Sequence, residues 1–398
     1  MNIIMTLLGV LGAVYGLWFV VIAVLGCLKK YEAPAAAAPK TRFAVLIPAR
    51  NERNVVGYLV RNMLAQKYPR ELFDVIVIPN NCSDDTADIA REAGARVLEC
   101  TVPVKSKGDV LRFTFDALKA DGYDAYCILD ADNLASDGFL AAANNAICDG
   151  MDIAQGFRDS KNPLDGWVAG DTSIFFWIMN KFYYRARVAL GLSAALNGTG
   201  IVISRSLVDR LGWNMVTLTE DLEYTGLCAA ESVKIGFLED AIVYDEQPVG
   251  IWDSIVQRRR WFKGGMQCFR VHAAALAKRH SLHCIDMLMV FGGWVMMLTG
   301  IFSGAVTIWN ILTGLIGGSI PLIGLIGFGA AALALVYGAC VLAAWAVCRV
   351  VKKRVTTSAI IMFPIFLVTW GIANLWALVT PAPGWQQIAH VRGTDRPD

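Results

Sequence analysis

Long stretches of hydrophobic residues lie toward both ends of this chain, with a mixed segment between them. Residues 3–28 form an almost unbroken apolar run, and three further runs occupy 287–312, 320–347 and 359–379. About twenty consecutive apolar residues are enough for a helix to cross a bilayer. The pattern predicts one candidate transmembrane segment before a soluble middle region and three after it.

The first apolar run has two interpretations. Small residues at Ala35, Ala36 and Ala37 resemble the cleavage site of a secretory signal peptide. The run is long for such a peptide, however, and Lys29-Lys30 follows it rather than preceding it. A basic flank on that side favours a membrane anchor at residues 1–28, with the lysines in the cytosol and a linker over 29–40.

The later apolar runs support the same orientation. Four basic residues separate the second and third of these runs, whereas the loop near Gly317 and Gly318 carries no charge; the basic residues are Arg349, Lys352, Lys353 and Arg354. Because basic loops stay on the cytoplasmic side, we expect a multi-pass plasma-membrane protein with a cytosolic middle region. Pro364 interrupts the last run, which is either a full crossing or a re-entrant segment.

Between residues 41 and 250 the pattern alternates between short β-rich runs and helical periodicity. Strands are predicted at 43–47, 75–78, 97–100 and 126–129, and helices up to about residue 66, after Ser83, and over 108–120. Such alternation predicts an α/β domain with a mostly parallel sheet, in which ligands bind beyond the carboxyl ends of the strands. Interfacial helices are expected over 251–284, membrane segments over 285–380 and a tail over 381–398.

The amino-acid composition agrees with a membrane protein and argues against a nucleic-acid partner. The 398 residues are 56% hydrophobic and only 18% charged, which is more apolar than a soluble domain of this size. The net charge is +2 and no basic run resembles a nucleic-acid-binding stripe, so we expect no nucleic-acid partner. The ten cysteines are scattered without a Cys-x-x-Cys pair, as expected for thiols in a reducing compartment.

Two carboxylates directly follow the fourth predicted strand, in Asp130-Ala131-Asp132. Mg²⁺ and Mn²⁺ prefer oxygen ligands and leave room for phosphate oxygens, so this pair can hold a cation together with a diphosphate. An ordinary acidic turn is the alternative. The position at a strand end favours the metal interpretation.

Polar loops follow the first two predicted strands. They are Pro48–Glu52 and Asn80–Asp85, whose asparagines can bind a base or ribose. The simpler interpretation is that Ser83 caps the next helix while Asp84 and Asp85 interact with its dipole. Lys105 and Lys107, at the start of another predicted helix, are either phosphate ligands or solvated side chains.

Three later motifs carry candidate chemistry. Thr219-Glu220-Asp221 is either a capped helix start or a site whose Asp221 acts as general base. Gln257-Arg258-Arg259-Arg260-Trp261 suits an interfacial helix, and also a site in which Arg260 stabilises a leaving phosphate and Trp261 stacks on a sugar. The loop Asn197-Gly198-Thr199-Gly200 is a candidate contact for the acceptor.

These motifs, in this order, resemble those of the family 2 glycosyltransferases, and specifically the membrane-integrated branch that includes cellulose, hyaluronan and poly-N-acetylglucosamine synthases. The resemblance covers residues 42–270. It implies a GT-A fold, which is Rossmann-like, joined to transmembrane helices, an inverting mechanism, a UDP-sugar donor and Mg²⁺ or Mn²⁺.

The resemblance also implies roles for individual residues. Nucleotide or diphosphate contacts fall on Asn51, Glu52, Asn81, Asp85, Lys107 and Asp130. Asp130 and Asp132 form the metal-binding motif, with Asp132 the direct ligand. Asp221 is the catalytic base, and Gln257, Arg260 and Trp261 match the Gln-x-x-Arg-Trp motif of enzymes that extend glycans or glycosylate lipids. Asn81 departs from the family, which usually has aspartate there.

The expected reaction is therefore transfer of a sugar from UDP to a growing polysaccharide. One span before the middle region and two or three after it are few for a sugar channel, so chain extrusion implies a small membrane partner subunit or a second copy. Single transfer to a lipid acceptor is the alternative within the same class. A membrane transport or binding protein that only senses a nucleotide is the alternative from another class.

Overall fold

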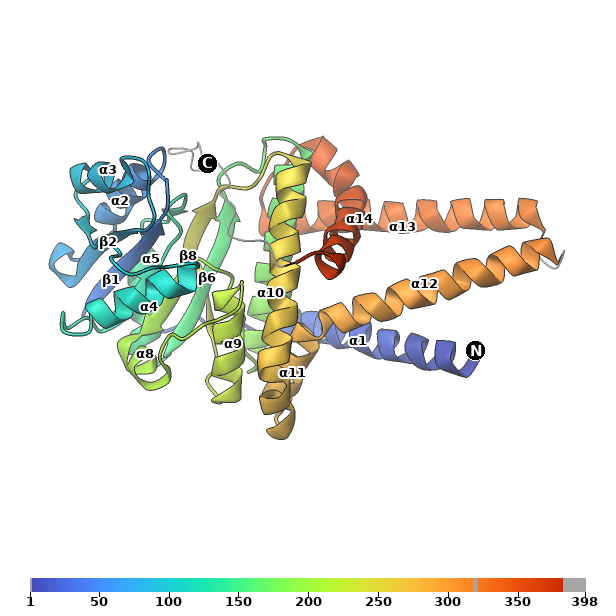
Figure 1. The fold of residues 1–398 in the computed structure, drawn as a ribbon, viewed down its shortest axis with the longest axis horizontal. Coiled ribbons are helices and arrows are strands. Elements are labelled where there is room, and N and C mark those ends of the chain that lie inside the picture. The colour runs from blue at the N-terminus through green and yellow to red at the C-terminus, as the bar shows by residue number, and fades with distance from the viewer. Residues whose placement is uncertain (1, 318–320, 382–398) are drawn as a thin grey trace.

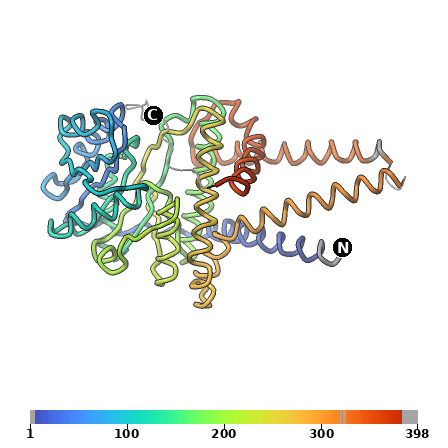
Figure 2. The backbone as a smooth tube through the Cα atoms, viewed as in Figure 1, coloured from blue at the N-terminus to red at the C-terminus, as the bar shows by residue number. Residues whose placement is uncertain are grey.

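The computed structural model describes residues 2–317 and 321–381. An α/β domain forms one end of the molecule, and three long helices extend from it in a similar direction (Figure 1). Figure 2 shows the same arrangement as a backbone tube, with the N-terminal helix beside segments from the C-terminal third. Residues 382–398 of the predicted tail, Gly318 of the predicted glycine loop and Ile320 at the start of a predicted span lie outside the described residues.

A mixed sheet organises the α/β domain. Within the described residues its strand order is β3-β2-β1-β4-β7-β6-β8-β5. The strands are β1 (Phe43–Ala49), β2 (Phe73–Pro79), β3 (Arg96–Val97), β4 (Ala125–Ile128), β5 (Leu134–Ala135), β6 (Ile153–Ser160), β7 (Ile201–Ser204) and β8 (Gly236–Asp245). The half containing β3, β2, β1 and β4 is parallel, as predicted, whereas β7 runs antiparallel to both of its neighbours.

Both faces of the sheet are buried, because successive side chains of a strand point to opposite sides. In β1, Phe43, Val45 and Ile47 join one core cluster and Ala44 and Leu46 join the other. The first cluster includes side chains of α2 (Val56–Leu64), α3 (Thr86–Glu92) and α5 (Phe139–Cys148). The second includes side chains of α4 (Lys107–Ala117), α8 (Arg205–Leu211) and α9 (Glu220–Ala230).

The strand directions bring six loops to one edge of the sheet. The parallel strands β1, β2 and β4 end there, and Ile128 at the end of β4 pairs with Ile201 at the start of β7. Because β6 and β8 are antiparallel to β7, their last residues also reach this edge. Loops that are more than a hundred residues apart in sequence therefore face one another.

Several predicted boundaries are wrong by a few residues. The third predicted strand is reduced to Arg96–Val97, and the helix predicted up to residue 66 ends at Leu64. Ser83 does not cap α3, since its backbone N–H and hydroxyl donate to Asn51, and Asp84 accepts from the Thr86 backbone instead. Thr219 does stand immediately before α9, but its side chain makes no capping bond.

Four helices are long and apolar enough to cross a membrane, within the part of the chain that the structure describes. They are α1 (Asn2–Leu28), α12 (Gly293–Ile316), α13 (Leu322–Val351) and α14 (Thr357–Val379). The span predicted to begin at 287 begins six residues later. Residues up to Phe291 form a separate helix, α11 (Leu282–Phe291), and the glycines at 292 and 293 favour the break between the two helices.

Helix α14 differs from the other three candidates. In Figure 1, α1, α12 and α13 point away from the domain, whereas α14 lies beside the upper part of α10 (Ile251–Lys278) at the base of α13. One third of its apolar window (33%) is buried, against 0–6% for the other three helices. Lys263 of α10 donates to the carbonyls of Ala377 and Thr380, at 2.9 and 3.0 Å, which holds the end of α14 against the domain.

Two helices of the α/β domain contact the membrane helices. Ile174 and Trp177 of α6 (Trp167–Ile178) pack in one cluster with side chains of α13 and α14. A fully buried ion pair joins Arg187 of α7 (Arg185–Ala189) to Asp286 of α11 at 2.9 Å, and Trp18 of α1 donates to the same carboxylate. Two short turns complete the described chain, η1 (Arg70–Leu72) and the π-helical η2 (Met179–Tyr184).

Candidate active site

A cleft of about 270 Å³ opens at the edge of the sheet where the six loops meet. Its wall contains nine of the eleven residues to which the sequence gave roles. They are Glu52, Asn81, Lys107, Asp130, Asp132, Asp221, Gln257, Arg260 and Trp261. Carboxylates from β4 and α9 and cations from α4 and α10 therefore converge on one space, as the sequence motifs predict.

Lys107 connects the acidic loop to the loop before β7. Its ammonium pairs with the carboxylate of Asp130 and donates to the carbonyl of Gly198 at 2.6 Å. Burial opposes the charge on this lysine, but Asp130, Glu220 and Asp221 together raise its pKa. The ammonium is thus held as a cation within reach of both acidic motifs.

The side chain of Asn133 fixes the position of the acidic loop Asp130-Ala131-Asp132 by hydrogen bonds. Its side-chain amide donates to Asp132 at 3.3 Å and to Asp245 at 2.9 Å, while its carbonyl oxygen accepts from the Asp130 backbone at 3.2 Å. The hydroxyl of Thr199 donates to the same oxygen. Because these bonds join β4, β7 and β8, the Asp132 carboxylate, whose residue is only 6% exposed, has a fixed position at the wall of the cleft.

The donor set of the cleft fits a hard divalent cation. Asp130 and Asp132 present carboxylate oxygens at the wall, which are the ligands that Mg²⁺ and Mn²⁺ prefer. Within the described residues, no three His, Cys, Asp or Glu side chains are grouped as a complete metal site. A cation at these two aspartates would therefore complete its coordination with ligands from outside the protein, such as phosphate oxygens and water.

Two adjacent carboxyls, Glu220 and Asp221, begin α9 and face the cleft. Burial raises the pKa of Glu220 to about 7, and the negative charge of Asp221 contributes in the same direction. Burial also raises the pKa of Asp221, while a backbone bond and the cations Lys107, Arg260 and Arg158 oppose this change. A carboxylate with a raised pKa near a bound diphosphate is suited to accept a proton.

The Gln-x-x-Arg-Trp motif lies on one turn of α10, and three of its side chains reach the cleft. Arg260 is near enough to lower the pKa values of both Glu220 and Asp221. The Trp261 ring lies 6.0 Å from that of Phe176 and 6.2 Å from that of Trp370. The motif therefore joins the cleft to aromatic side chains of α6 and α14.

Two residues with predicted roles, Asn51 and Asp85, are not in the cleft wall. The side-chain oxygen of Asn51 accepts from the Ser83 backbone at 2.8 Å, which fixes the loops after β1 and β2 together. Asp85 is exposed and forms a 3.9 Å ion pair with Arg53. The structure thus gives both residues contacts within these loops rather than in the cleft.

Three charged residues of the cleft wall were not predicted: Arg158, Asp245 and Glu246. Arg158 binds Asp245 in a buried ion pair and donates to the carbonyl of Asn197 at 2.9 Å. Charged residues inside a strand, at Arg158 and Asp159 of β6, are the sequence signal that could have identified this region.

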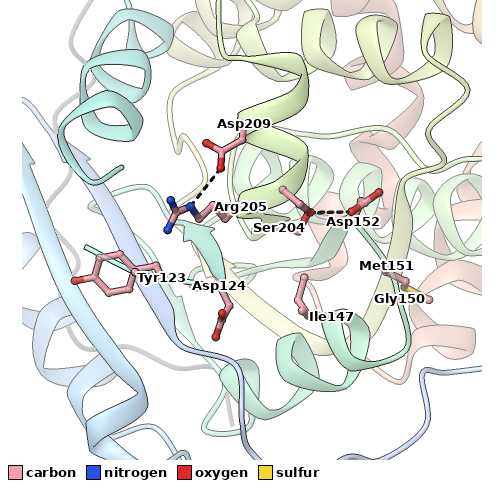
Figure 3. Close-up of a pocket in the computed structure, with 11 residues that line it drawn as sticks. Tyr123, Asp124, Ile147, Gly150, Met151, Asp152, Ser204, Arg205 and Asp209 are labelled. Carbon is pink, nitrogen blue, oxygen red and sulfur yellow. Dashed lines mark hydrogen bonds and ion pairs between the residues drawn. The ribbon is translucent and has the colours of Figure 1, made fainter. Parts of the chain in front are cut away.

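A second, larger cavity of about 460 Å³ lies at the opposite edge of the sheet (Figure 3). Its polar groups bond to one another: Arg205 pairs with Asp209 at 3.3 Å, and the Ser204 hydroxyl donates to Asp152 at 3.0 Å. None of the motifs singled out in the sequence reaches it. The smaller cleft is therefore the candidate active site.

Comparison with known proteins agrees with this choice. Residues 39–264 match the family described as "Glycosyltransferase like family 2". A probable glycosyltransferase of Bacillus subtilis, YdaM, is 26% identical over 68% of this chain and 66% of its own length. A beta-monoglucosyldiacylglycerol synthase of Trichormus variabilis is 26% identical over 56% of this chain and 49% of its own. The chain thus spans about half to two thirds of the length of these curated relatives.

Among solved structures, a mannosyltransferase of Pyrobaculum calidifontis in complex with GDP-Man and Mn²⁺ superposes with a TM-score of 0.64. The superposition covers 94% of this chain and 98% of that one, at 19% sequence identity, so the two share their fold. More than half of the present chain lies within the family match, and the domain has the GT-A arrangement. The chain therefore belongs to the family 2 glycosyltransferases.

Proposed function

We propose that the protein transfers a glycosyl unit from a nucleoside-diphosphate sugar to a hydroxyl of a membrane lipid. The donor expected from the family resemblance is a UDP-sugar. The observation that carries the proposal is the position of the cleft. Its wall includes Gln257, Arg260 and Trp261 of α10, and α10 packs against the apolar helix α14, which supports an acceptor that approaches the cleft from the membrane.

The arrangement of the membrane helices favours a lipid acceptor over a polysaccharide. None of the described residues of α12 is buried, and the apolar windows of α12 and α13 are 0% buried. A channel for a glycan chain needs helices that pack around a polar lumen. These helices instead expose the side chains of their apolar windows, so polymer extrusion would need a partner subunit or a second copy.

The orientation follows from charge. The basic residues Lys29, Lys30, Lys352 and Arg354 lie at the domain ends of α1 and α13, and Lys353 forms a 2.9 Å ion pair with Asp159 of β6. By the positive-inside rule, the domain is cytosolic and the distal ends of α12 and α13 face the other side. A cytosolic domain has access to nucleotide sugars made in the cytosol.

The proposed chemistry is a single displacement with inversion. The Asp221 carboxylate accepts the proton of the acceptor hydroxyl as its oxygen attacks the anomeric carbon of the donor sugar. The bond from that carbon to the diphosphate breaks, and the diphosphate leaves toward Lys107 and Arg260, whose charges stabilise it. A divalent cation held by Asp130 and Asp132 would neutralise the same phosphate oxygens. Trp261 stacks on the acceptor.

The test is a donor and acceptor screen on the purified protein in nanodiscs of defined lipid composition, with Mg²⁺ and Mn²⁺ compared. We expect release of nucleoside diphosphate with at least one of UDP-glucose, UDP-galactose, UDP-N-acetylglucosamine and GDP-mannose. Mass spectrometry should show a lipid that carries one added glycosyl unit. Products with a long ladder of units would support polysaccharide synthesis, and no release above that of Asp221→Asn with any donor would overturn the proposed function.

A further inference from the structure

The loop before β7 lines the cleft but has no role in the chemistry above. Asn197 and Gly198 belong to the cleft wall. The backbone of Asn197 is fixed on both sides, because its N–H donates to Gln155 at 2.9 Å and its carbonyl accepts from Arg158 at 2.9 Å. The position of the Asn197 side chain is therefore set by buried strands rather than by a mobile loop.

The side-chain amide of Asn197 is buried without hydrogen bonds to the described protein atoms. Both its oxygen and its nitrogen lack a partner in hydrogen-bond geometry. The Tyr184 hydroxyl is close enough to the amide for a weak hydrogen bond that opposes the rise in the Tyr184 pKa caused by burial, but this contact falls outside full hydrogen-bond geometry. A buried amide without a well-formed hydrogen bond destabilises a fold, so such a group at the wall of an active-site cleft indicates a ligand that completes its hydrogen bonds.

The location of the amide identifies which ligand group it meets. The neighbouring Gly198 accepts from Lys107, on the diphosphate side, through its carbonyl. On its other side, a methyl group at Gly198 would lie 3.5 Å from the Asp221 carboxylate. The loop thus spans the gap between the diphosphate ligands and the base. An inverting displacement requires the donor sugar to occupy that gap, since the anomeric carbon must face both.

We propose that Asn197 is the residue that recognises the donor sugar, through hydrogen bonds between its amide and ring hydroxyls of a hexosyl group. A side-chain amide offers an N–H donor and a carbonyl acceptor close together, so it can bind two neighbouring hydroxyls of a sugar ring at once. Epimers differ in the direction of one hydroxyl, so this contact can distinguish them. The inference rests on the proposed function and assigns one specificity-determining residue within it.

The test compares binding of a nucleotide with and without its sugar. For the donor with the highest turnover in the wild-type screen, isothermal titration calorimetry with Mn²⁺ gives Kd for that nucleotide sugar and for the corresponding nucleoside diphosphate. In Asn197→Ala we expect the nucleotide sugar to bind about tenfold more weakly, which corresponds to one or two lost hydrogen bonds, while Kd for the nucleoside diphosphate stays within about twofold. Discrimination among the UDP-hexose epimers should fall as well.

Thermal stability separates recognition from a structural role. Removing an amide that has no partner should leave the Tm of the ligand-free protein unchanged or slightly higher. Asn144→Ala is the matched control. Its amide is fully bonded to Thr41, Ala37 and Ala38 far from the cleft, so that variant should lose stability while keeping the ratio of the two Kd values.

Two outcomes would overturn the inference while leaving the proposed function intact. One is an unchanged ratio of the two Kd values in Asn197→Ala, with normal epimer selectivity. The other is equal weakening of the nucleoside diphosphate and the nucleotide sugar together with a lower Tm, which is the result of a structural defect. If the wild-type protein turns over none of the donors, the proposed function itself has failed.

Discussion

Thr219 and Gly264 are in direct contact, although 45 positions separate them in sequence. A Cβ atom added to Gly264 would lie 2.3 Å from the hydroxyl oxygen of Thr219, which is closer than real Cβ contacts come. Thr219 immediately precedes the Glu220-Asp221 pair, and Gly264 lies three residues after Trp261. Because Gly264 has no side chain, α10 can approach the start of α9 closely, and this approach keeps the Gln-x-x-Arg-Trp motif near the proposed base.

This contact predicts that Gly264→Ala separates the two motifs. The added methyl group must push α10 away from the start of α9, so we expect turnover to fall at least about tenfold, by misplacement of reacting groups. Gly265→Ala is the control, because its Cβ would lie 3.8 Å from the nearest atom, on Leu222. Helix propensity favours alanine equally at both sites. Equal kinetics of the two variants would contradict the proposed importance of the contact.

Asp221→Asn should abolish transfer without abolishing nucleotide binding. The amide keeps the size of the carboxylate but cannot accept the acceptor's proton, so we expect turnover to fall by about 10² to 10⁴. Fluorescence or calorimetric titration should give a similar Kd for UDP in both proteins. Asp209→Asn, in the cavity at the opposite edge of the sheet, should keep normal turnover. Near-normal activity of Asp221→Asn would show that another group is the base.

The raised pKa of Glu220 predicts a specific dependence of stability on pH. Its pKa in the folded protein is about 7, against 4.5 for an ordinary glutamate, chiefly because of burial. A carboxyl with a raised folded pKa stabilises the fold below its unfolded pKa, and this contribution is lost as the pH rises through the folded value. The Tm of Glu220→Gln relative to wild type should therefore increase between about pH 4.5 and pH 7, and remain constant above that range. A pH-independent difference in Tm would show that Glu220 has an ordinary pKa.

Asp132 should dominate metal binding. Replacing its fixed carboxylate by an amide in Asp132→Asn removes a charged oxygen ligand, and we expect the affinity for Mn²⁺ in the presence of UDP to fall about a hundredfold or more. Electron paramagnetic resonance of free Mn²⁺ measures this affinity without reference to turnover. Asp85→Asn, outside the cleft, should bind Mn²⁺ as the wild type does. A comparable loss in both variants would contradict the assignment.

The packing of α14 predicts the side on which the described chain ends. Lys263 and Arg259 of α10 donate to carbonyls at Ala377, Thr380 and Pro381, so the end of α14 lies on the same side as the α/β domain. A green fluorescent protein fused after residue 381 should fluoresce, and an alkaline phosphatase at that position should be inactive. The same reporters inserted after Gly317, between α12 and α13, should give the opposite result. Phosphatase activity at residue 381 would show that α14 crosses the bilayer.

Local pattern was enough to predict most elements and the ends of the strands where ligands bind. Short β-rich apolar runs located β1, β2 and β4, and hydropathy located the four long apolar helices, because burial in a sheet or a bilayer acts on each segment separately. The motif loops after β1, β2 and β4 were placed together by a general property of parallel strands. Four of the nine predicted residues in the cleft wall lie on these loops: Glu52, Asn81, Asp130 and Asp132.

Other features depended on contacts between distant segments, which no local pattern records. Because Pro364 interrupts the last apolar run, the sequence allowed either a full crossing or a re-entrant segment for α14. Only the packing of α14 against α10 and α6 shows that this helix lies along the domain. Arg158 and Asp245 reach the cleft because β6 and β8 are antiparallel to β7, and strand direction is set by the topology of the whole sheet. Asn51 and Asp85 fit the family motifs by position, yet their side chains bond between the loops after β1 and β2 rather than in the cleft. Sequence alone thus determined the class of chemistry and the elements that carry it, because each element's pattern is local. The tertiary structure decided which side chains meet, because that depends on how the elements pack.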